Sequence, residues 1–290
     1  MATVKTADKP RWLLWVGVVA ITLFCLAPVL WQLLTSLKTN DALIVIPKSD
    51  GADLGTLLSL FLPIHLTSEH YQQLGGIFAR YMFNSGLVSL VSTLLCLAIG
   101  APAAYTLARL KLPGESLILG VVLIVSLFPY VLLFLGLLEL VKFLDLGNNY
   151  LALIVPYTAI NLPLTILVLR SFFQQLPKDL EDSAKVDGYN TVQMLWKIVL
   201  PMTVPALVTT GILTFIFAWN EFIFALTFIT QDQLQTIPIA VAKIGGASAY
   251  EIPYGAIAAA TILGTLPLIA LVLIFQRRIV QGITAGAVKG

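Results

Sequence analysis

The sequence predicts an all-α polytopic membrane protein with six transmembrane helices and a cytoplasmic helical loop between the fourth and fifth. Three observations predict this fold class. The 290 residues are 58% hydrophobic and only 11% charged, whereas soluble domains carry about 25% charged residues. Six apolar runs approach or exceed the length of about 20 residues that crosses a bilayer. One charge-rich segment, residues 176–201, separates the last two runs from the first four. We expect a single transmembrane domain over residues 1–290.

The six predicted spans follow one another along most of the chain. The first run exceeds the apolar core of a secretory signal, which is about 7–15 residues long, so we expect it to span the membrane. Residues 38–80 are mixed and polar, and we expect His65 and His70 to be surface histidines because their spacing does not suit a metal pair. The predicted spans are residues 12–34, 83–107, 117–138, 150–170, 204–227 and 255–276.

Basic residues predict the orientation. If the N-terminus lies inside, the inner segments hold 12 of the 17 Lys and Arg residues and the outer segments hold 5. Because cytoplasmic loops carry the excess of Lys and Arg, we expect both termini and the charge-rich segment in the cytoplasm.

The charge-rich segment predicts two short helices joined by a sharp turn. Pro177 suits the first turn of a helix, and the acidic Asp179, Glu181 and Asp182 suit the positive end of its dipole. Gly188 then offers the left-handed residue that commonly ends a helix. The result would be a small acidic knob that docks on a partner, although an ordinary amphipathic surface loop remains an alternative.

The second of these helices is expected to begin at a cap formed by Asn190 or Thr191 and to stop at Pro201. Its apolar residues recur at i, i+3, i+4 and i+7, which predicts that they share one face. These residues are Val192, Leu195, Trp196 and Val199.

Polar residues inside the spans are candidates for a transport path. Asn161 lies in the fourth predicted span, and Asn220 and Glu221 follow Trp219 in the fifth. A carboxylate inside a bilayer is costly and usually faces a cavity or a partner. Glu221 could therefore line a water-filled path or pair with another subunit, or it could lie at the interface and reach water.

The tail, residues 277–290, contains three glycines and two alanines after Arg277 and Arg278. These features predict a slim, flexible strip that could enter a narrow gap. A frayed terminus is the alternative, because chain ends are commonly poorly ordered.

The sequence lacks the common catalytic patterns. It contains no phosphate-binding Gly-rich loop with Lys, no His-Glu-x-x-His and no Gly-x-Ser-x-Gly. We therefore expect no catalytic residue, no metal site and no cofactor on this chain. The net charge of +2 suggests no nucleic-acid partner, and Cys25 and Cys96 fit small packing residues in apolar runs.

The charge-rich segment resembles a known signature. Glu181-x-x-Ala184-x-x-Asp187-Gly188 followed by Ile198-x-Leu200-Pro201 closely resembles the signature loop of binding-protein-dependent ABC importer permeases. Asp182 and Ser183 depart from the usual two alanines after the glutamate. Residues 217–222 and 282–290 look like the carbohydrate branch, in particular the shorter membrane subunit of maltose and trehalose importers.

The resemblance implies a coupling helix that docks on a cytoplasmic ATPase. The residues it assigns to this contact are Glu181, Ser183, Ala184, Asp187, Gly188, Ile198, Leu200 and Pro201. The tail, with Gly286 and Lys289, would also reach the ATPase. Candidates for the translocation path are Asn161, Trp219, Asn220 and Glu221.

The resemblance also implies partners and a location. The partners would be a second permease in a heterodimer, two copies of the ATPase that carry ATP and Mg, an extracytoplasmic solute-binding protein and a sugar. The location would be a bacterial or archaeal plasma membrane. Alternatives are an ion-gradient-driven transporter that uses Glu221, a permease for a non-sugar solute, and a membrane scaffold.

Overall fold

The structure is a computed structural model that describes residues 11–43, 66–246 and 252–287. The described residues are helical apart from their connections, and the one extended pairing among them is an isolated bridge between Lys38 and Leu66. This confirms the predicted all-α class. Contacts divide the chain into two compact units, residues 1–75 with 243–263 (unit 1) and residues 76–242 with 264–290 (unit 2).

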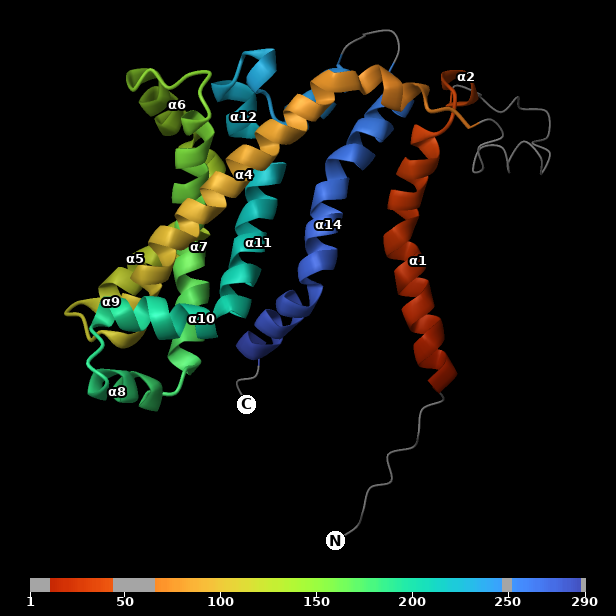
Figure 1. Cartoon of the computed structure of the whole chain (residues 1–290). Helices are drawn as coiled ribbons and strands as arrows, with labels where there is room; N and C mark the ends of the chain where they lie inside the picture. The colour runs from red at the N-terminus through yellow and green to blue at the C-terminus, as the bar shows by residue number, and fades with distance from the viewer. Residues whose placement is uncertain (1–10, 44–65, 247–251, 288–290) are drawn as a thin grey trace. The chain divides into compact units, whose positions relative to one another are not determined.

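The described helices run from Arg11 to Ala287 in the order shown in Figure 1. The first eight elements are α1 (Arg11–Ser36), α2 (Asn40–Leu43), α4 (Glu69–Arg109), α5 (Glu115–Leu127), the 3-10 turn η1 (Tyr130–Leu133), α6 (Phe134–Phe143), α7 (Leu151–Gln175) and α8 (Asp179–Val186). The rest are α9 (Thr191–Met194), the π-turn η2 (Leu195–Val199), α10 (Leu200–Met202), α11 (Val204–Asn220), α12 (Ile223–Phe228), the 3-10 turn η3 (Asp232–Leu234), α13 (Ile237–Gly245) and α14 (Tyr254–Ala287).

Among these residues, four helices are long and apolar enough to cross a membrane by themselves: α1, α4, α7 and α14. Two further spans are bent pairs. Residues 115–127 and 130–143 meet at 91°, and residues 191–202 and 204–220 meet at 80°. Counting each bent pair as one span gives six, as the sequence predicts.

The bend after α5 has a local cause. Phe128 is extended with ψ of 131°, as expected for a residue that precedes proline, and Pro129 is extended too, immediately before the 3-10 turn η1. The sequence contains other prolines inside predicted spans, but Pro28, Pro102, Pro156, Pro163 and Pro267 all lie within helices. The positions of the prolines in the sequence therefore do not show that the helix breaks at Pro129 and not at the others.

Unit 2 contains two hydrophobic clusters at its two ends. In Figure 1, α8 and α9 lie at one end of this unit, and α6 and α12 lie at the other. The cluster at the α12 end includes Leu153 and Tyr157 of α7 with Phe224 and Phe228 of α12. The cluster at the α8 end includes Tyr105, Phe173, Leu195 and Val199. Each end of the unit therefore packs around its own core.

Small residues bring the helices of unit 2 close together. A Cβ on Gly100 of α4 would lie 2.7 Å from Thr165 Cγ2 of α7, and one on Gly211 of α11 would lie 3.1 Å from Leu97 of α4. Close approach at small residues is a usual way for membrane helices to pack, because lipid supplies no hydrophobic drive between them.

Unit 1 corrects the expectation that His70 is a surface histidine. Its side chain is buried, and its Nε2 lies 2.9 Å from the carbonyl oxygen of Lys38. A Cβ on Gly255 would lie only 2.2 Å from the same Nε2, so glycine leaves the space for the imidazole. Burial also lowers the pKa of Lys38. His65 lies outside the described residues.

Candidate functional site

The acidic helix α8 ends as the sequence predicts. Asp179, Glu181 and Asp182 occupy its first turn, where the helix dipole favours negative charge. Gly188 has φ of +83° and therefore adopts the left-handed conformation. The N–H of Gly188 bonds to the Lys185 carbonyl and that of Tyr189 to the Ala184 carbonyl, which is the Schellman pattern of a helix end.

The second helix begins with the predicted cap. The Asn190 side chain accepts from the Gln193 N–H at 2.8 Å, and the Gln193 side chain accepts from the Asn190 N–H at 3.0 Å. This reciprocal capping box satisfies two N–H groups that a helix start leaves unpaired. The turn between α8 and α9 is therefore fixed on both sides by its own hydrogen bonds.

The prediction that Pro201 stops this helix is wrong. The chain stays helical through Met202, and the break comes at Thr203, whose φ of −103° departs from the helix. A π-turn over Leu195–Val199 immediately precedes the proline. The wider turn changes the hydrogen-bond ladder just where Pro201 has no N–H to contribute.

The prediction that the four apolar residues of this helix form a single packed face is also partly wrong. Leu195 and Val199 are buried as expected, together with Met194, but Val192 and Trp196 are 65% and 60% exposed. The two pairs lie on adjacent stripes of the helix, each spaced i, i+4. The first stripe belongs to the α8-end cluster, whereas the second is an exposed apolar surface. Val186 of α8 is also exposed, at 87%.

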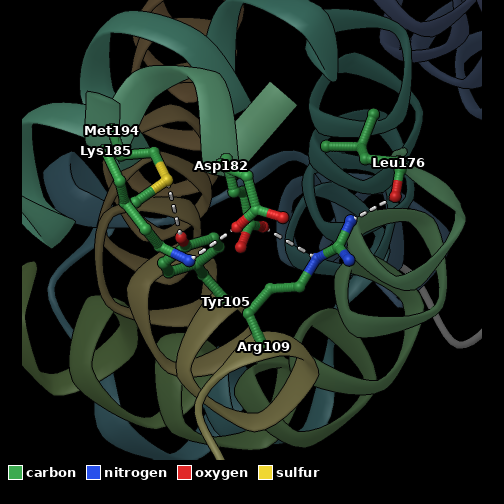
Figure 2. Close-up of polar contacts among 7 residues, drawn as sticks. Tyr105, Arg109, Leu176, Asp182, Lys185 and Met194 are labelled. Atoms are coloured by element: carbon green, nitrogen blue, oxygen red, sulfur yellow. Dashed lines mark hydrogen bonds and ion pairs between the residues drawn. The ribbon is translucent and has the colours of Figure 1, made fainter. Parts of the chain in front are cut away.

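The side chain of Glu181 faces the end of α4. Its Oε1 lies 3.0 Å from Nε of Arg109, the last residue of α4, and the two side chains are 14% and 5% exposed. The N–H is poorly aligned with the oxygen, so the contact is an ion pair rather than a good hydrogen bond. The guanidinium also donates from Nη2 to the carbonyl of Leu176, which follows the last residue of α7 (Figure 2). Arg109 therefore joins α4, α7 and α8.

A second contact in Figure 2 joins α9 to α4. The hydroxyl of Tyr105 donates to the sulfur of Met194 at 3.6 Å, and the Tyr105 ring meets Phe173 of α7 edge-on. Ala184 of α8 is also buried. The remaining predicted coupling residues are accessible: Ser183, Asp187, Gly188 and Pro201 are exposed, and Ile198 and Leu200 are half-buried.

Glu221 lies at the opposite end of unit 2, in the break between α11 and α12. Its carboxylate accepts from the backbone N–H groups of Ile223, Phe224 and Ala225 at 2.8–3.2 Å. The hydroxyl of Tyr157 donates to it at 2.6 Å. The residue is only 4% exposed, so the alternative in which it lies at the interface and reaches water is wrong. In this arrangement the carboxylate caps the first turn of α12.

Comparison with known proteins identifies the family. Residues 97–285 match the family described as "Binding-protein-dependent transport system inner membrane component". The chain belongs to this family.

Curated relatives of this permease cover almost its whole length. It is 39% identical over 92% of its length to the trehalose transport system permease protein SugB of Mycobacterium tuberculosis, of which 93% is covered. It is 36% identical over 97% of its length to the trehalose/maltose transport system permease protein MalG of Thermococcus litoralis, of which 97% is covered.

Solved structures share the fold of the permease. A chain from a bacterial ABC transporter involved in alginate import superposes with a TM-score of 0.74 at 19% identity, covering 96% of this chain and 99% of that one. A chain of the MetNI methionine ABC transporter superposes with a TM-score of 0.57 at 16% identity, covering 74% and 99%. Together with its apolar helices, the family membership makes the chain an integral membrane protein.

The path candidates of the permease lie in three different environments. Trp219 is buried and donates from Nε1 to the carbonyl of Gly264 in α14 at 3.1 Å. Asn220 is exposed, and among the described residues its side chain bonds to the carbonyl of Ile216 in its own helix. Asn161 lines a cavity between α5, α7 and α11. The three consecutive residues 219–221 therefore do not form one polar surface.

The tail of the permease differs from the flexible strip that its glycines predict. Helix α14 continues to Ala287 and includes Gly286. No proline follows Pro267, and isolated glycines weaken a helix by about 1 kcal/mol each without ending it. Lys289 lies outside the described residues.

Two arginines and one tyrosine of the permease are contact residues that sequence reasoning did not assign. Arg170 of α7 pairs with Glu115 of α5 at 2.9 Å and donates to the carbonyl of Leu107 at 3.0 Å. Arg109 and Arg170 entered the sequence argument only as charges that indicate orientation, and Tyr157 did not enter it. The sequence signal for the two arginines was their position at the ends of apolar runs.

Proposed function

We propose that this chain is the membrane-spanning subunit of an ATP-driven sugar importer. Its membership of the binding-protein-dependent family supports this, as do relatives named for trehalose and for trehalose/maltose transport. A solute-binding protein would deliver the sugar from outside, and a second permease would supply the other half of the path. Two copies of a cytoplasmic ATPase would bind ATP and Mg, so this chain would hydrolyse no ATP itself.

The proposed orientation places both termini and the α8–α10 element in the cytoplasm of a bacterium or archaeon, with the spans in the plasma membrane. The excess of Lys and Arg on that side supports this orientation. The last residues, including Gly286 and Lys289, would then lie on the same side as the ATPase.

The observation that carries the proposal is how α8–α10 is attached to the spans. Arg109 joins α8 to the ends of α4 and α7, and Tyr105 joins α9 to α4. Helix α10 leads through Thr203 directly into α11. A displacement of this element by a partner would therefore reach three spans at once.

The coupling follows from this attachment. The exposed residues Ser183, Asp187 and Gly188, with the apolar Val192 and Trp196, are accessible to the ATPase. ATP binding and release would favour two different positions of α8–α10, and the attached spans would alternate between inward- and outward-open arrangements. Such a shift requires that the nucleotide states bind the two arrangements with different affinity.

The test uses the complex of this chain with its ATPase, second permease and binding protein in proteoliposomes. We expect Arg109→Gln or Glu181→Gln to lower the sugar carried per ATP about tenfold, because the loss of one charged contact costs about 1.5–3 kcal/mol. Lys185→Gln is the matched control. It removes the exposed Lys185–Asp182 pair at 3.1 Å, which should contribute about 0–1 kcal/mol.

Two outcomes would contradict this function. If both variants kept the wild-type ratio of sugar to ATP, the Arg109–Glu181 pair would not transmit motion. If uptake by the wild-type complex followed an ion gradient and not ATP, the chain would be a secondary transporter.

A further inference from the structure

A cavity of about 350 Å³ lies where the bend after α5 faces α7 and α11. Small-molecule sites have volumes of about 300–1,000 Å³, so this cavity suits one ring rather than a long chain. Its lining combines apolar, aromatic and polar side chains. The lining includes Ser126, Phe128, Tyr130, Pro156, Asn161 and Phe217.

The position of the cavity follows from the broken helix. The extended Phe128 and the 91° bend at Pro129 turn η1 away from the axis of α5. Pro156 and Asn161 of α7 line the space that this bend leaves. At membrane depth, non-helical backbone occurs where it lines a cavity, and in secondary transporters such discontinuous helices commonly form the substrate site.

Polar groups with unused hydrogen-bonding capacity reach this cavity. Asn161 donates from Nδ2 to the Tyr157 carbonyl at 2.7 Å, which leaves its amide oxygen able to accept from a ligand. The described contacts of Tyr130 are ring contacts, so its hydroxyl is able to donate. A ligand with several hydroxyl groups could use both residues.

Aromatic rings form part of the apolar lining of the cavity, together with aliphatic side chains of α5, η1, α6 and α7. Phe217 lies edge-on to Tyr130, with ring centroids 5.3 Å apart, and edge-on to Tyr157 at 6.4 Å. These contacts fix the orientation of the Phe217 ring. A fixed aromatic ring beside hydrogen-bonding groups suits a ligand that is apolar on one face and polar at its rim, as a sugar ring is.

A second groove provides a contrast. It has a volume of about 230 Å³ between α4, α11 and α14, and apart from Thr93 and Gly211 its lining side chains are Leu, Ile, Val and Phe. Phe215 lines this groove, two residues before Phe217 on the same helix. The two aromatic residues thus belong to surfaces of different chemistry.

We infer that the cavity at the α5–η1 bend binds one ring of the transported sugar, with Phe217 against the ring face and Asn161 and Tyr130 bonded to its hydroxyls. The inference rests on the proposed function and adds to it that this chain holds the sugar itself. Neither the family match nor the names of the relatives assigns a ligand to these residues.

The test measures uptake of trehalose and maltose by the reconstituted complex at saturating binding protein. We expect Phe217→Ala and Asn161→Ala to lower the uptake rate about tenfold. Stimulation of the ATPase by the loaded binding protein should stay within about twofold of the wild type. The matched control is Phe215→Ala, which removes the stacking on Trp219 at 5.6 Å and should keep uptake.

A chemical readout keeps the test independent of folding defects. Ser126→Cys places a thiol in the cavity, Cys25→Ser removes the exposed native thiol, and Cys96 is buried. We expect trehalose or maltose, whichever the complex carries, to slow maleimide labelling of Cys at position 126 about tenfold when the binding protein and ATP are present.

The outcomes separate this site from the proposed function. Unchanged uptake in both Phe217→Ala and Asn161→Ala, an equal loss in Phe215→Ala, or labelling that sugar does not slow would overturn the cavity site while wild-type uptake continued. A wild-type complex that carries no sugar with ATP would overturn the proposed function together with this site.

Discussion

The two ends of unit 2 each hold a largely buried glutamate, and they satisfy it in different ways. Glu181 at the α8 end relies on one charged partner, Arg109, and keeps 14% of its side chain exposed. Glu221 at the α12 end is only 4% exposed and accepts from four donors: the hydroxyl of Tyr157 and three backbone N–H groups.

The difference indicates different roles for the two carboxylates. A carboxylate with four neutral donors is locked into the local fold, because moving it would leave every donor unpaired. A largely buried carboxylate with one ion pair between two helices instead ties those helices together, because separating the pair would leave a charge unpaired. We therefore interpret Glu221 as a local cap of α12 and Glu181 as the link between α8 and α4.

The largest expected effect tests the local cap. Glu221→Ala leaves three N–H groups and the Tyr157 hydroxyl without their acceptor, at about 1–3 kcal/mol for each buried group and not strictly additive. We expect little folded protein in the membrane and a lower Tm in detergent. Asn220→Ala is the control, because Asn220 is exposed and, in the described part of the chain, its side-chain hydrogen bond stays inside its own helix.

The opposite result would restore the path role that the sequence suggests. If Glu221→Ala assembled with its partners at wild-type abundance and lost only uptake, the carboxylate would act in transport rather than in folding.

A smaller effect at the same end would sharpen the comparison. Tyr157→Phe removes one of the four donors and keeps the buried ring, so we expect a loss of about 1.5–3 kcal/mol in the free energy of unfolding. Thermal unfolding of the purified protein measures it. A loss as large as that of Glu221→Ala would mean that the hydroxyl, and not the set of N–H groups, holds the carboxylate.

At the α8 end, Gly188→Ala should strain the turn. A side chain at φ of +83° costs about 1–2 kcal/mol. The turn carries the exposed face of α8–α10, so we expect sugar uptake to fall several-fold while the protein still inserts. Gly136→Ala is the matched control, because Gly136 lies within α6 and a Cβ there meets nothing within 4 Å.

The variant Gly188→Asn distinguishes backbone strain from loss of the glycine surface. Asparagine adopts the left-handed conformation more readily than alanine, so uptake should recover in part. Equal uptake by the Ala and Asn variants would show that conformation at position 188 is not the constraint.

The smallest expected effect concerns the start of α9. Asn190→Ala removes one half of the capping box and should cost about 1 kcal/mol of helix stability. Hydrogen exchange of the amides of residues 191–194 measures it. Exchange that rises equally at the α12 end would contradict a local role for this cap.

Features of the candidate site that depend on neighbouring residues could be predicted from the sequence. The acidic first turn of α8, the left-handed Gly188 and the Asn190 cap each involve residues within a few positions of one another. Their preferences are set by backbone sterics and by local hydrogen bonds. The same local reasoning failed at Pro201, because the π-turn before it is not visible in a periodicity of 3.6 residues.

Features that join distant residues could not be predicted. Arg109 and Glu181 are 72 positions apart, and Tyr157 and Glu221 are 64 apart. Basic residues at the ends of spans and tyrosines inside them fit many partners equally well. Which acidic residue faces Arg109 depends on how α4, α7 and α8 pack together.

The sequence by itself determined that six apolar segments enter a membrane and that a capped acidic turn separates two of them, since both depend on composition and on short-range backbone preference. Only the tertiary structure decided that Glu221 is a buried cap, that Pro129 is the proline that breaks its span, and that Arg109 connects the turn to the spans. Burial and ion pairing depend on which helices meet, and long-range packing, not local preference, determines those contacts.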